Sequence, residues 1–148
     1  MEKETSDREV MLWVRLAMTF NVVYQEIKHE LNKEENITVP QLEIIACLDR
    51  TKGLSLSEIA ERLLVTGGNI TGLIDRMERD GYVHRVRDKT DRRVVKALLT
   101  EKGFELYKSF YPRYKKIMQR INSGLTEEER KQLQRLLKKL AKGVMQKG

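Results

Sequence analysis

Residues 88–103, DKTDRRVVKALLTEKG, constrain the fold of this 148-residue chain more than any other segment. Asp91, Arg92 and Arg93 stand where the tip of a β-hairpin is expected, and a strand and then a helix beginning at Thr100 follow them. Directly before this segment, residues 66–81 have the pattern of a short helix that opens with small polar residues. A helix followed by a basic hairpin is the element order of a winged helix-turn-helix. Two guanidiniums at a tight tip suit the narrow, negative minor groove of DNA, so this order predicts DNA binding.

Helix starts are marked by capping boxes, in which a Ser or Thr precedes a Glu or Gln by three residues. They begin at Ser6, Thr38, Ser55 and Thr126. Together with the hydrophobic periodicity, they predict helices at 6–32, 39–50, 56–63, 67–80, 101–122 and 126–145, strands at 83–88 and 93–99, and a candidate third strand at Leu54. The predicted fold class is therefore mainly α with a small β-hairpin wing, a winged helix-turn-helix core flanked by N- and C-terminal dimerisation helices.

The chain length favours a single winged-helix domain, 1–148, with a DNA-binding lobe at 36–100 and dimerisation helices at 6–32 and 101–145. Apolar residues in the first, fifth and last predicted helices alternate at spacings of three and four, which suits packing against another helix. These helices carry more apolar surface than is needed to cover the small middle region, so we expect them to pack against a second chain in a homodimer. A monomer that folds them onto its own core is the alternative. Pro112, inside the fifth helix, predicts a kink near residues 109–111.

The third and fourth predicted helices form the helix-turn-helix, with a turn at residues 64–66, and the second of them offers its N-terminal residues to base edges. Ile70, Leu73, Ile74 and Met77 would face inward, which leaves Asn69 able to present its amide to adenine. Three glycines in the first two turns are costly in a helix, and a bare backbone would allow close approach to DNA. For Gly67 and Gly68, the simpler interpretation is a turn followed by a loosely formed first turn of the helix.

Charge is distributed unevenly, with a net +12 over residues 84–148 against −3 over 1–35 and −2 over 36–83. The recognition helix ends in acidic residues, so the hairpin must supply most of the attraction to phosphates. We expect Asp91 to orient an arginine through a bidentate pair. The simpler alternative to DNA binding is a charged hairpin that only faces solvent. The residues predicted to contact DNA are Ser55, Ser57, Thr66, Gly67, Gly68, Asn69, Thr71, Gly72, Arg76, Arg85, Arg87, Lys89, Asp91, Arg92, Arg93 and Lys96.

Other classes of protein find little support in the sequence. No apolar run reaches the length of a membrane span, and no signal peptide is recognisable, so we expect a cytoplasmic protein without a membrane partner. Cys47, the single cysteine, lies in an apolar run and is expected to be a buried, inert thiol. His29 and His84 are far apart, and no nucleophile–base pair or metal-ligand cluster stands out. We therefore expect no enzyme, no metal and no cofactor.

Three blocks of residues resemble the MarR family of bacterial and archaeal transcription regulators. They are 56–60 (LSEIA), 69–83 (NITGLIDRMERDGYV) and Asp91-Arg92-Arg93 followed by 99–103 (LTEKG). The resemblance extends over essentially the whole chain. It implies a triangular homodimer joined by the first, fifth and sixth helices, with recognition helices in major grooves and wings in minor grooves of a pseudopalindromic operator. It also implies that Arg92 and Arg93 are the wing arginines, with Asp91 as their partner.

Many members of this family lose DNA affinity when a small phenolic or aromatic anion binds between the dimer helices and the DNA-binding lobe. The resemblance therefore implies a ligand-responsive repressor. Candidate effector-binding residues are Trp13, Phe20, Tyr24, Phe110 and Tyr111. For any one of these aromatics, a place in the core or the dimer interface is the simpler interpretation. An architectural DNA-binding protein of weak specificity and a winged-helix protein-interaction module remain as alternative functions.

Overall fold

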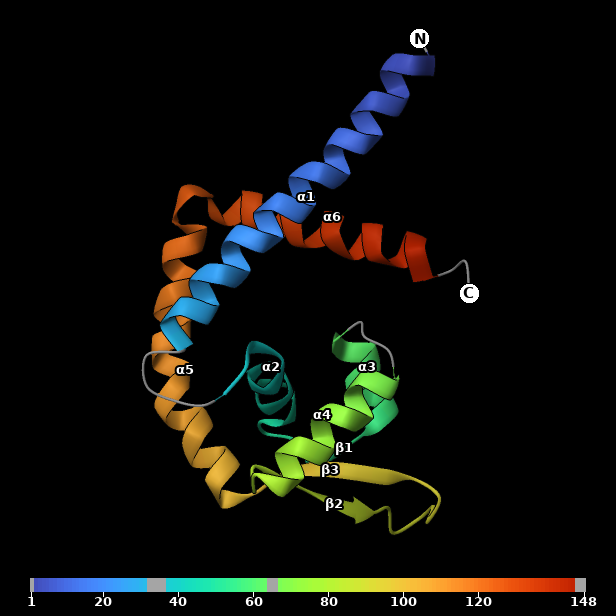
Figure 1. The fold of residues 1–148 in the computed structure, drawn as a ribbon, viewed down its shortest axis with the longest axis vertical. Coiled ribbons are helices and arrows are strands. Elements are labelled where there is room, and N and C mark those ends of the chain that lie inside the picture. Colours follow the sequence, from blue (N-terminus) through green and yellow to red (C-terminus); the bar gives the residue numbers. More distant parts are fainter. Residues whose placement is uncertain (1, 32–36, 64–66, 146–148) are drawn as a thin grey trace. The chain divides into compact units, whose positions relative to one another are not determined.

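A computed structural model of the chain describes residues 2–31, 37–63 and 67–145. It divides into two compact units, Met1–Pro112 and Arg113–Gly148, and each is described by itself. The fold is mainly helical with one small antiparallel sheet (Figure 1), so the predicted fold class is confirmed. The elements of the first unit are α1 (Glu2–Leu31), α2 (Val39–Leu48), β1 (Leu54–Ser55), α3 (Leu56–Leu63), α4 (Gly67–Arg79), β2 (Val83–Arg87), β3 (Val95–Leu99) and the first part of α5 (Glu101–Ile121).

The sheet has the order β1-β3-β2, and both pairings are antiparallel. Leu54 pairs with Ala97, which confirms the candidate third strand, and Val83 pairs with Leu99 at the base of the hairpin. Helices α2, α3 and α4 pack against one another and against this sheet. The far end of the β2–β3 hairpin extends beyond them (Figure 1).

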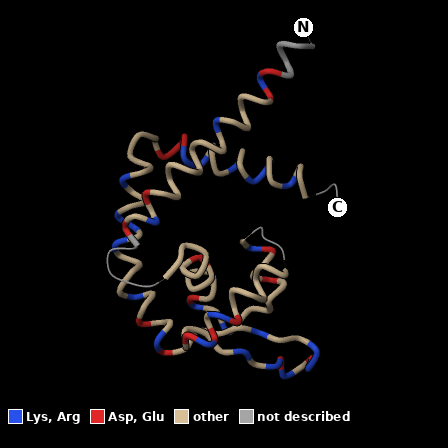
Figure 2. The backbone as a smooth tube through the Cα atoms, viewed as in Figure 1, with Lys and Arg blue, Asp and Glu red and all other residues tan. Residues whose placement is uncertain are grey.

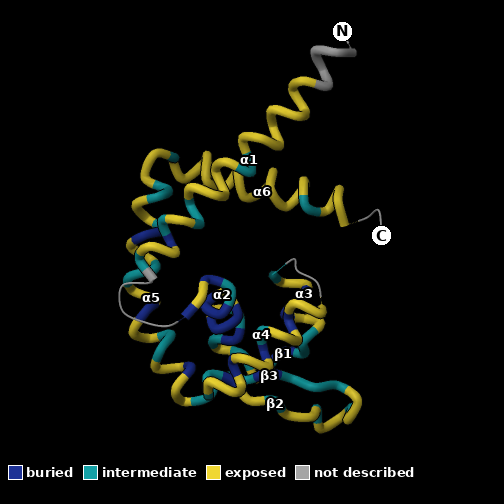
Figure 3. The backbone as a smooth tube through the Cα atoms, viewed as in Figure 1, coloured by how far each residue is buried: buried dark blue, intermediate teal, exposed yellow. Residues whose placement is uncertain are grey.

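The core of this unit lies between α2, α3, α4 and the sheet (Figure 3). Its largest fully buried side chains are Ile44, Ile45, Ile59, Ile70, Ile74, Met77 and Val83. In α4 the buried residues recur at spacings of three and four, so one face of the helix enters the core and the other stays in solvent. The inward face predicted for α4 is confirmed, except that Leu73 is half-buried.

The predicted capping boxes at Thr38, Ser55 and Thr126 are present, and the one at Ser6 lies outside the described side chains. At α2, Gln41 N donates to Thr38 Oγ1 and Thr38 N donates to Gln41 Oε1. The same reciprocal bonds join Ser55 to Glu58 at α3, and Thr126 to Glu129 at α6 (Glu127–Met145). The predicted start of the first helix is wrong: α1 begins at Glu2 and not at residue 6, because no Gly or Pro before residue 6 interrupts it.

Other boundaries differ by one or two residues for local reasons. Helix α2 ends at Leu48 and not at residue 50, because Arg50 takes a φ of 59° in the turn to β1 and Thr51 Oγ1 donates to Leu48 O. Strand β3 begins at Val95 and not at residue 93, because the preceding residues belong to the wing turn. Helix α5 passes through Pro112, and the kink expected there stays a prediction.

The second unit contains the end of α5, a short 3-10 helix η1 (Asn122–Gly124) that was not predicted, and α6. Arg130 Nη1 donates to Leu125 O at 2.7 Å and so ties α6 to the turn before it. The leucines at 133, 136, 137 and 140 of α6 are 42–46% exposed. These leucines form an exposed apolar stripe on α6.

Candidate nucleic-acid interface

The outward face of α4 carries the residues predicted to read bases. Gly67, Gly68, Asn69, Thr71, Gly72 and Arg76 are all exposed, whereas Thr66 lies outside the described residues. Thr71 Oγ1 donates to Gly67 O at 3.1 Å, which leaves its oxygen free to accept. A Cβ added at any of the three glycines would meet no atom within 4 Å, so packing does not require them. At Gly72, inside α4, the cost in helix stability of about 1 kcal/mol is therefore not offset by packing against the described residues.

The start of α3 presents the two predicted serines. Ser55 is half-buried and its hydroxyl accepts the N–H of Glu58, so it acts as the helix cap. Its backbone N–H in turn donates to Glu58, and this hydrogen bond holds the pKa of Glu58 below its ordinary value. Ser57 is exposed, with its hydroxyl 3.1 Å from that of Ser55. Ser57 is therefore the more available of the two for a phosphate.

The wing, defined as residues 87–95, is shaped by Asp88. One oxygen of its carboxylate accepts the N–H groups of Thr90 at 2.8 Å and Asp91 at 3.0 Å, and the other accepts Lys96 Nζ at 2.7 Å. Asp88 N donates to Val94 O at 2.9 Å and closes the turn. An Asp at the first position of a turn is a recognisable sequence signal for this arrangement, and Asp88 was predicted here only as a charge of the hairpin.

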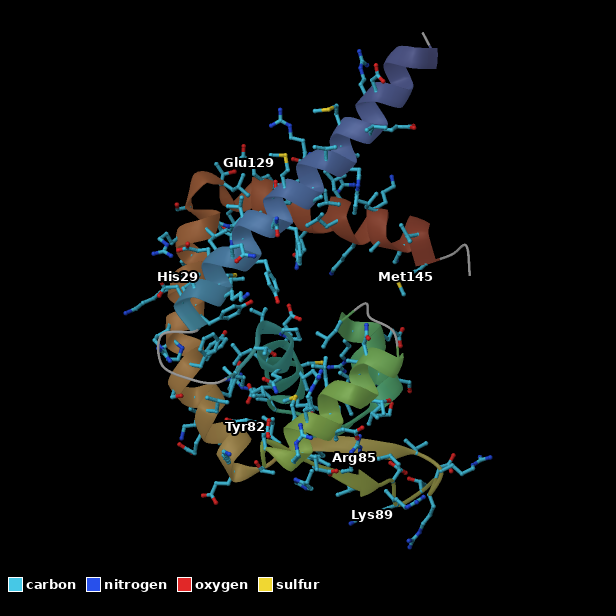
Figure 4. All side chains as sticks on the ribbon, in the orientation of Figure 1. His29, Tyr82, Arg85, Lys89, Glu129 and Met145 are labelled. Atoms are coloured by element: carbon cyan, nitrogen blue, oxygen red, sulfur yellow. The ribbon has the colours of Figure 1, made fainter. Side chains whose placement is uncertain are left out.

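At the tip, Arg93 donates to both oxygens of Asp91, with Nε–Oδ1 at 3.2 Å and Nη2–Oδ2 at 3.3 Å. The predicted bidentate pair is therefore present. The Arg93 side chain is still 92% exposed. Arg87 Nη1 donates to Arg92 O at 2.9 Å, and the side chains of Lys89 and Arg92 are exposed. Figure 2 shows these cations gathered along the far part of the hairpin, and Figure 4 labels Lys89 there.

Arg85 and Lys96 were also predicted to contact DNA, but they do not lie among the exposed cations of the hairpin. Lys96, in β3, is paired with Asp88 of the wing. Arg85 lies against α4, where its guanidinium pairs with Asp75 and Glu78. The exposed basic set of the hairpin is therefore Arg87, Lys89, Arg92 and Arg93.

The hydrogen bonds to Asp88 make the stability of the wing sensitive to acid. Those from Lys96 and from the N–H groups of Asp91 and Thr90 hold the pKa of Asp88 well below its ordinary value. A carboxyl whose folded pKa is depressed contributes stability above its unfolded pKa, about 3.9, and loses it as pH falls through the folded pKa. We expect the free energy of unfolding of Asp88→Asn to fall less steeply than that of the unchanged protein below about pH 4. Urea unfolding at several pH values measures both slopes, and parallel slopes would contradict the assignment.

The end of α4 is fixed to the start of α5 by a cluster that we call the α4–α5 joint: Gly81, Tyr82, Thr100, Lys102 and Gly103. Thr100 Oγ1 donates to Gly81 O at 2.6 Å and accepts the N–H of Gly103 at 3.1 Å, so one hydroxyl caps α5 and holds the turn. Thr100 N donates to Tyr82 O, and Lys102 Nζ lies 4.5 Å from the Tyr82 ring centre. The recognition helix thus has a direct connection to α5.

The aromatic residues predicted to bind an effector are not gathered at one place within the described chain. Phe20 and Tyr24 stack with ring centres 5.6 Å apart on α1, Tyr111 lies 5.0 Å from Tyr107 on α5, and Phe110 is buried. Trp13 is 66% exposed. An apolar groove on α1, lined in part by Met11, Met18 and Val22, has a volume of about 540 Å³ and contains none of the five predicted residues. Effector binding therefore stays a prediction.

Cys47 is half-buried, where a buried thiol was expected. Burial raises its pKa, which favours the thiol over the reactive thiolate. Within 2–31, 37–63 and 67–145, no helix is long and apolar enough to cross a membrane. The same residues contain no cluster of three or more His, Cys, Asp or Glu side chains that could hold a metal ion.

Comparison with known proteins agrees with this geometry. The family model of the MarR family matches residues 37–95. The HTH-type transcriptional repressor MdtR of Bacillus subtilis is 32% identical, over 87% of this chain and 85% of its own. The structure of S. aureus MepR in complex with DNA is 26% identical with a TM-score of 0.76, and the match covers 88% of this chain and 96% of that one.

The structure of Bordetella bronchiseptica BpsR, described for regulation of its DNA binding by 6-hydroxynicotinic acid, also has a TM-score of 0.76. It is 21% identical, and the match covers 88% of this chain and 98% of that one, so it shows the shared fold. The matched family segment contains the helix-turn-helix and the whole wing. With its exposed recognition face, its basic wing tip and its relatives, this chain belongs to the MarR family of transcriptional regulators.

Proposed function

We propose that this protein is a sequence-specific DNA-binding transcriptional regulator that binds a pseudopalindromic operator as a homodimer. The observation that carries the proposal is the coexistence, in one unit, of an uncovered polar face on α4 and an exposed basic wing on the β2–β3 hairpin. The first suits base edges in the major groove, and the second suits phosphates and the minor groove. Such a regulator acts in the cytoplasm and by binding, without a catalytic step.

Dimerisation is supported by the apolar residues that α1 and α6 leave in solvent. Trp13, Met18 and Phe20 of α1 are 65–66% exposed, and the leucine stripe of α6 is uncovered. Exposed apolar side chains at helical spacing are typical of a helix–helix interface. Sedimentation should therefore give twice the 17.4 kDa mass of one chain. A particle of one chain's mass would refute the dimer.

The direction of regulation and the effector follow from relatives. Repression is proposed because MdtR, which matches most of this chain, is a repressor. Response to a small aromatic or phenolic anion is proposed because BpsR shares the fold and is regulated by 6-hydroxynicotinic acid. The exposed aromatic rings of α1 and α5 offer a surface of suitable chemistry.

Selection of bound DNA from a random pool tests this function, and Asn69 supplies the sharpest comparison. We expect the unchanged protein to select an inverted repeat with half-sites about one helical turn apart. Asn69→Ala should relax the preference at one or two positions in each half-site, at about 1–3 kcal/mol per position, because its amide suits adenine. A uniform loss of affinity across all sequences would make Asn69 a positioning residue.

The alternative functions give different outcomes in the same selection. A weakly specific architectural protein would bind with a steep salt dependence but enrich no motif. A protein-interaction module would retain no DNA even at low salt. Either result would overturn the proposal.

A further inference from the structure

Three charged side chains connect the recognition helix to the first strand of the wing hairpin. Arg85, in the middle of β2, donates from Nη1 to Glu78 Oε1 at 2.9 Å and from Nη2 to Asp75 Oδ1. The backbone N–H of Arg85 donates to Glu78 Oε2 at 2.8 Å. Both oxygens of Glu78 are therefore occupied by one residue of the strand. Figure 4 labels Arg85 next to α4.

The position of β2 in the sheet makes this connection important. β2 is an edge strand, paired only with β3 among the described strands, so Glu78 accepts an N–H that lies on the open edge. Residues alternate between the two faces of a strand, and Arg85 shares its face with the buried Val83, which faces the core. The guanidinium thus lies between the strand and α4, and its side chain is 23% exposed.

Its surroundings distinguish Arg85 from the cations of the wing tip. To reach a phosphate, its guanidinium would have to leave two carboxylates to which it is already bound. Arg92 is exposed, and Arg93, although paired with Asp91, has a side chain that is 92% exposed. The acidic residues of α4 also have a clear use. Asp75 and Glu78 stand one turn apart on the helix face that meets β2, instead of merely opposing DNA.

We propose that Asp75, Glu78 and Arg85 form a clamp that sets the orientation of the wing relative to the recognition helix, and that Arg85 is a positioning residue and not a phosphate contact. The proposal rests on the proposed DNA-binding function. A sequence-specific complex needs α4 and the wing to reach their grooves at the same time. Nonspecific binding depends on charge and tolerates a change in their relative orientation.

Simple electrostatics and the clamp predict opposite effects for the loss of Glu78. Removing a carboxylate from a DNA-facing lobe should strengthen binding if only charge matters. If the clamp sets the wing, Glu78→Ala should weaken operator binding about tenfold, as expected for breaking a coupled interaction. Affinity for scrambled DNA should stay equal or rise, so the ratio of the two affinities should fall.

Asp80→Ala is the matched control. Asp80 directly follows α4 and is exposed, and among the described residues its carboxylate has no hydrogen-bond or ion-pair partner. The variant therefore makes the same change in charge as Glu78→Ala without altering the clamp. It should leave the affinity ratio unchanged. Arg85→Ala should lower the ratio as Glu78→Ala does, and the double variant should lower it no further, because either change opens the same clamp.

The salt dependence of operator binding separates positioning from phosphate contact. If Arg85 contacted a phosphate, Arg85→Ala would reduce the salt slope by about 1 per protomer. We expect no such reduction, and Arg85→Lys should keep the slope and still lose specificity, since a lysine cannot replace the forked guanidinium. Glu78→Gln, which can still accept the Arg85 N–H, provides a milder variant if Glu78→Ala does not fold.

The experiment measures operator affinity, scrambled-DNA affinity and salt slope for the unchanged protein and these variants, with thermal unfolding to verify folding. The expected result is a lower affinity ratio for Glu78→Ala and Arg85→Ala but not for Asp80→Ala. Equal ratios for Glu78→Ala and Asp80→Ala, or a reduced slope for Arg85→Ala, would overturn the clamp. If the unchanged protein itself showed no preference for any sequence, the proposed function would have failed instead.

Discussion

Gly103→Ala is expected to lower the free energy of unfolding by about 3 kcal/mol or more. A Cβ at this position would lie 2.2 Å from Tyr82 O and 3.1 Å from Tyr82 C, which are backbone atoms and cannot rotate away. Relief of the clash would require α5 to move from Tyr82, which would stretch the hydrogen bonds of Thr100 to Gly81 and Tyr82. Denaturant unfolding of the variant and the unchanged protein measures the difference.

Gly72→Ala is the matched control for this substitution. Gly72 lies inside α4, and a Cβ there would meet nothing within 4 Å, so the same change should raise stability by about 1 kcal/mol. The two variants should therefore shift the unfolding midpoint in opposite directions. If Gly103→Ala were as stable as the unchanged protein, the α4–α5 joint would not be close-packed as described.

The second large effect is expected from the wing. Arg92→Ala combined with Arg93→Ala removes two exposed guanidiniums from each protomer and four from a dimer. We expect operator affinity to fall by about a hundredfold at 0.15 M salt, and the salt slope to fall as well, because fewer counterions are released. The dimer and its stability should remain unchanged, since both side chains project into solvent. Fluorescence anisotropy at several salt concentrations provides the measurement.

A control with the same loss of charge separates the wing from net charge. Lys138→Ala combined with Lys139→Ala removes two exposed cations from α6, which lies outside the DNA-binding lobe predicted at residues 36–100. That variant should lose far less affinity than the wing variant. An equal loss in both would mean that total charge, and not the wing tip, determines binding.

The local features of the fold were predictable because local chemistry determines them. The capping boxes at Thr38, Ser55 and Thr126 pair residues three positions apart, and all three are present. The bidentate pair of Asp91 with Arg93 also joins near neighbours in the chain, which explains why it could be inferred from the sequence.

The roles of Arg85 and Lys96 were not predictable, because a count of hairpin charges does not give the direction of a side chain. Arg85 meets Asp75 across ten residues of sequence, and the contact exists only once β2 has packed beside α4. Lys96 meets Asp88 only when the hairpin has closed. In both cases tertiary structure places a residue that was predicted to contact DNA in an ion pair with another residue of the lobe.

The missed boundaries have a similar origin. The turn at Arg50 depends on the position of β1 beside β3, which the sequence of α2 does not contain. The early start of α1 reflects the opposite situation, in which a capping signal at Ser6 is present but the residues before it continue the helix. A capping signal determines a helix start only where the preceding residues stop the helix.

If α4 reads DNA sequence while the wing supplies attraction, this protein should distinguish its operator from other DNA of the same length. Competition between the selected operator and a scrambled duplex of equal length, at 0.15 M salt, measures this difference. We expect the operator to bind about a thousandfold more tightly or better, within the range of specific regulators. Equal affinities for the two duplexes would contradict it.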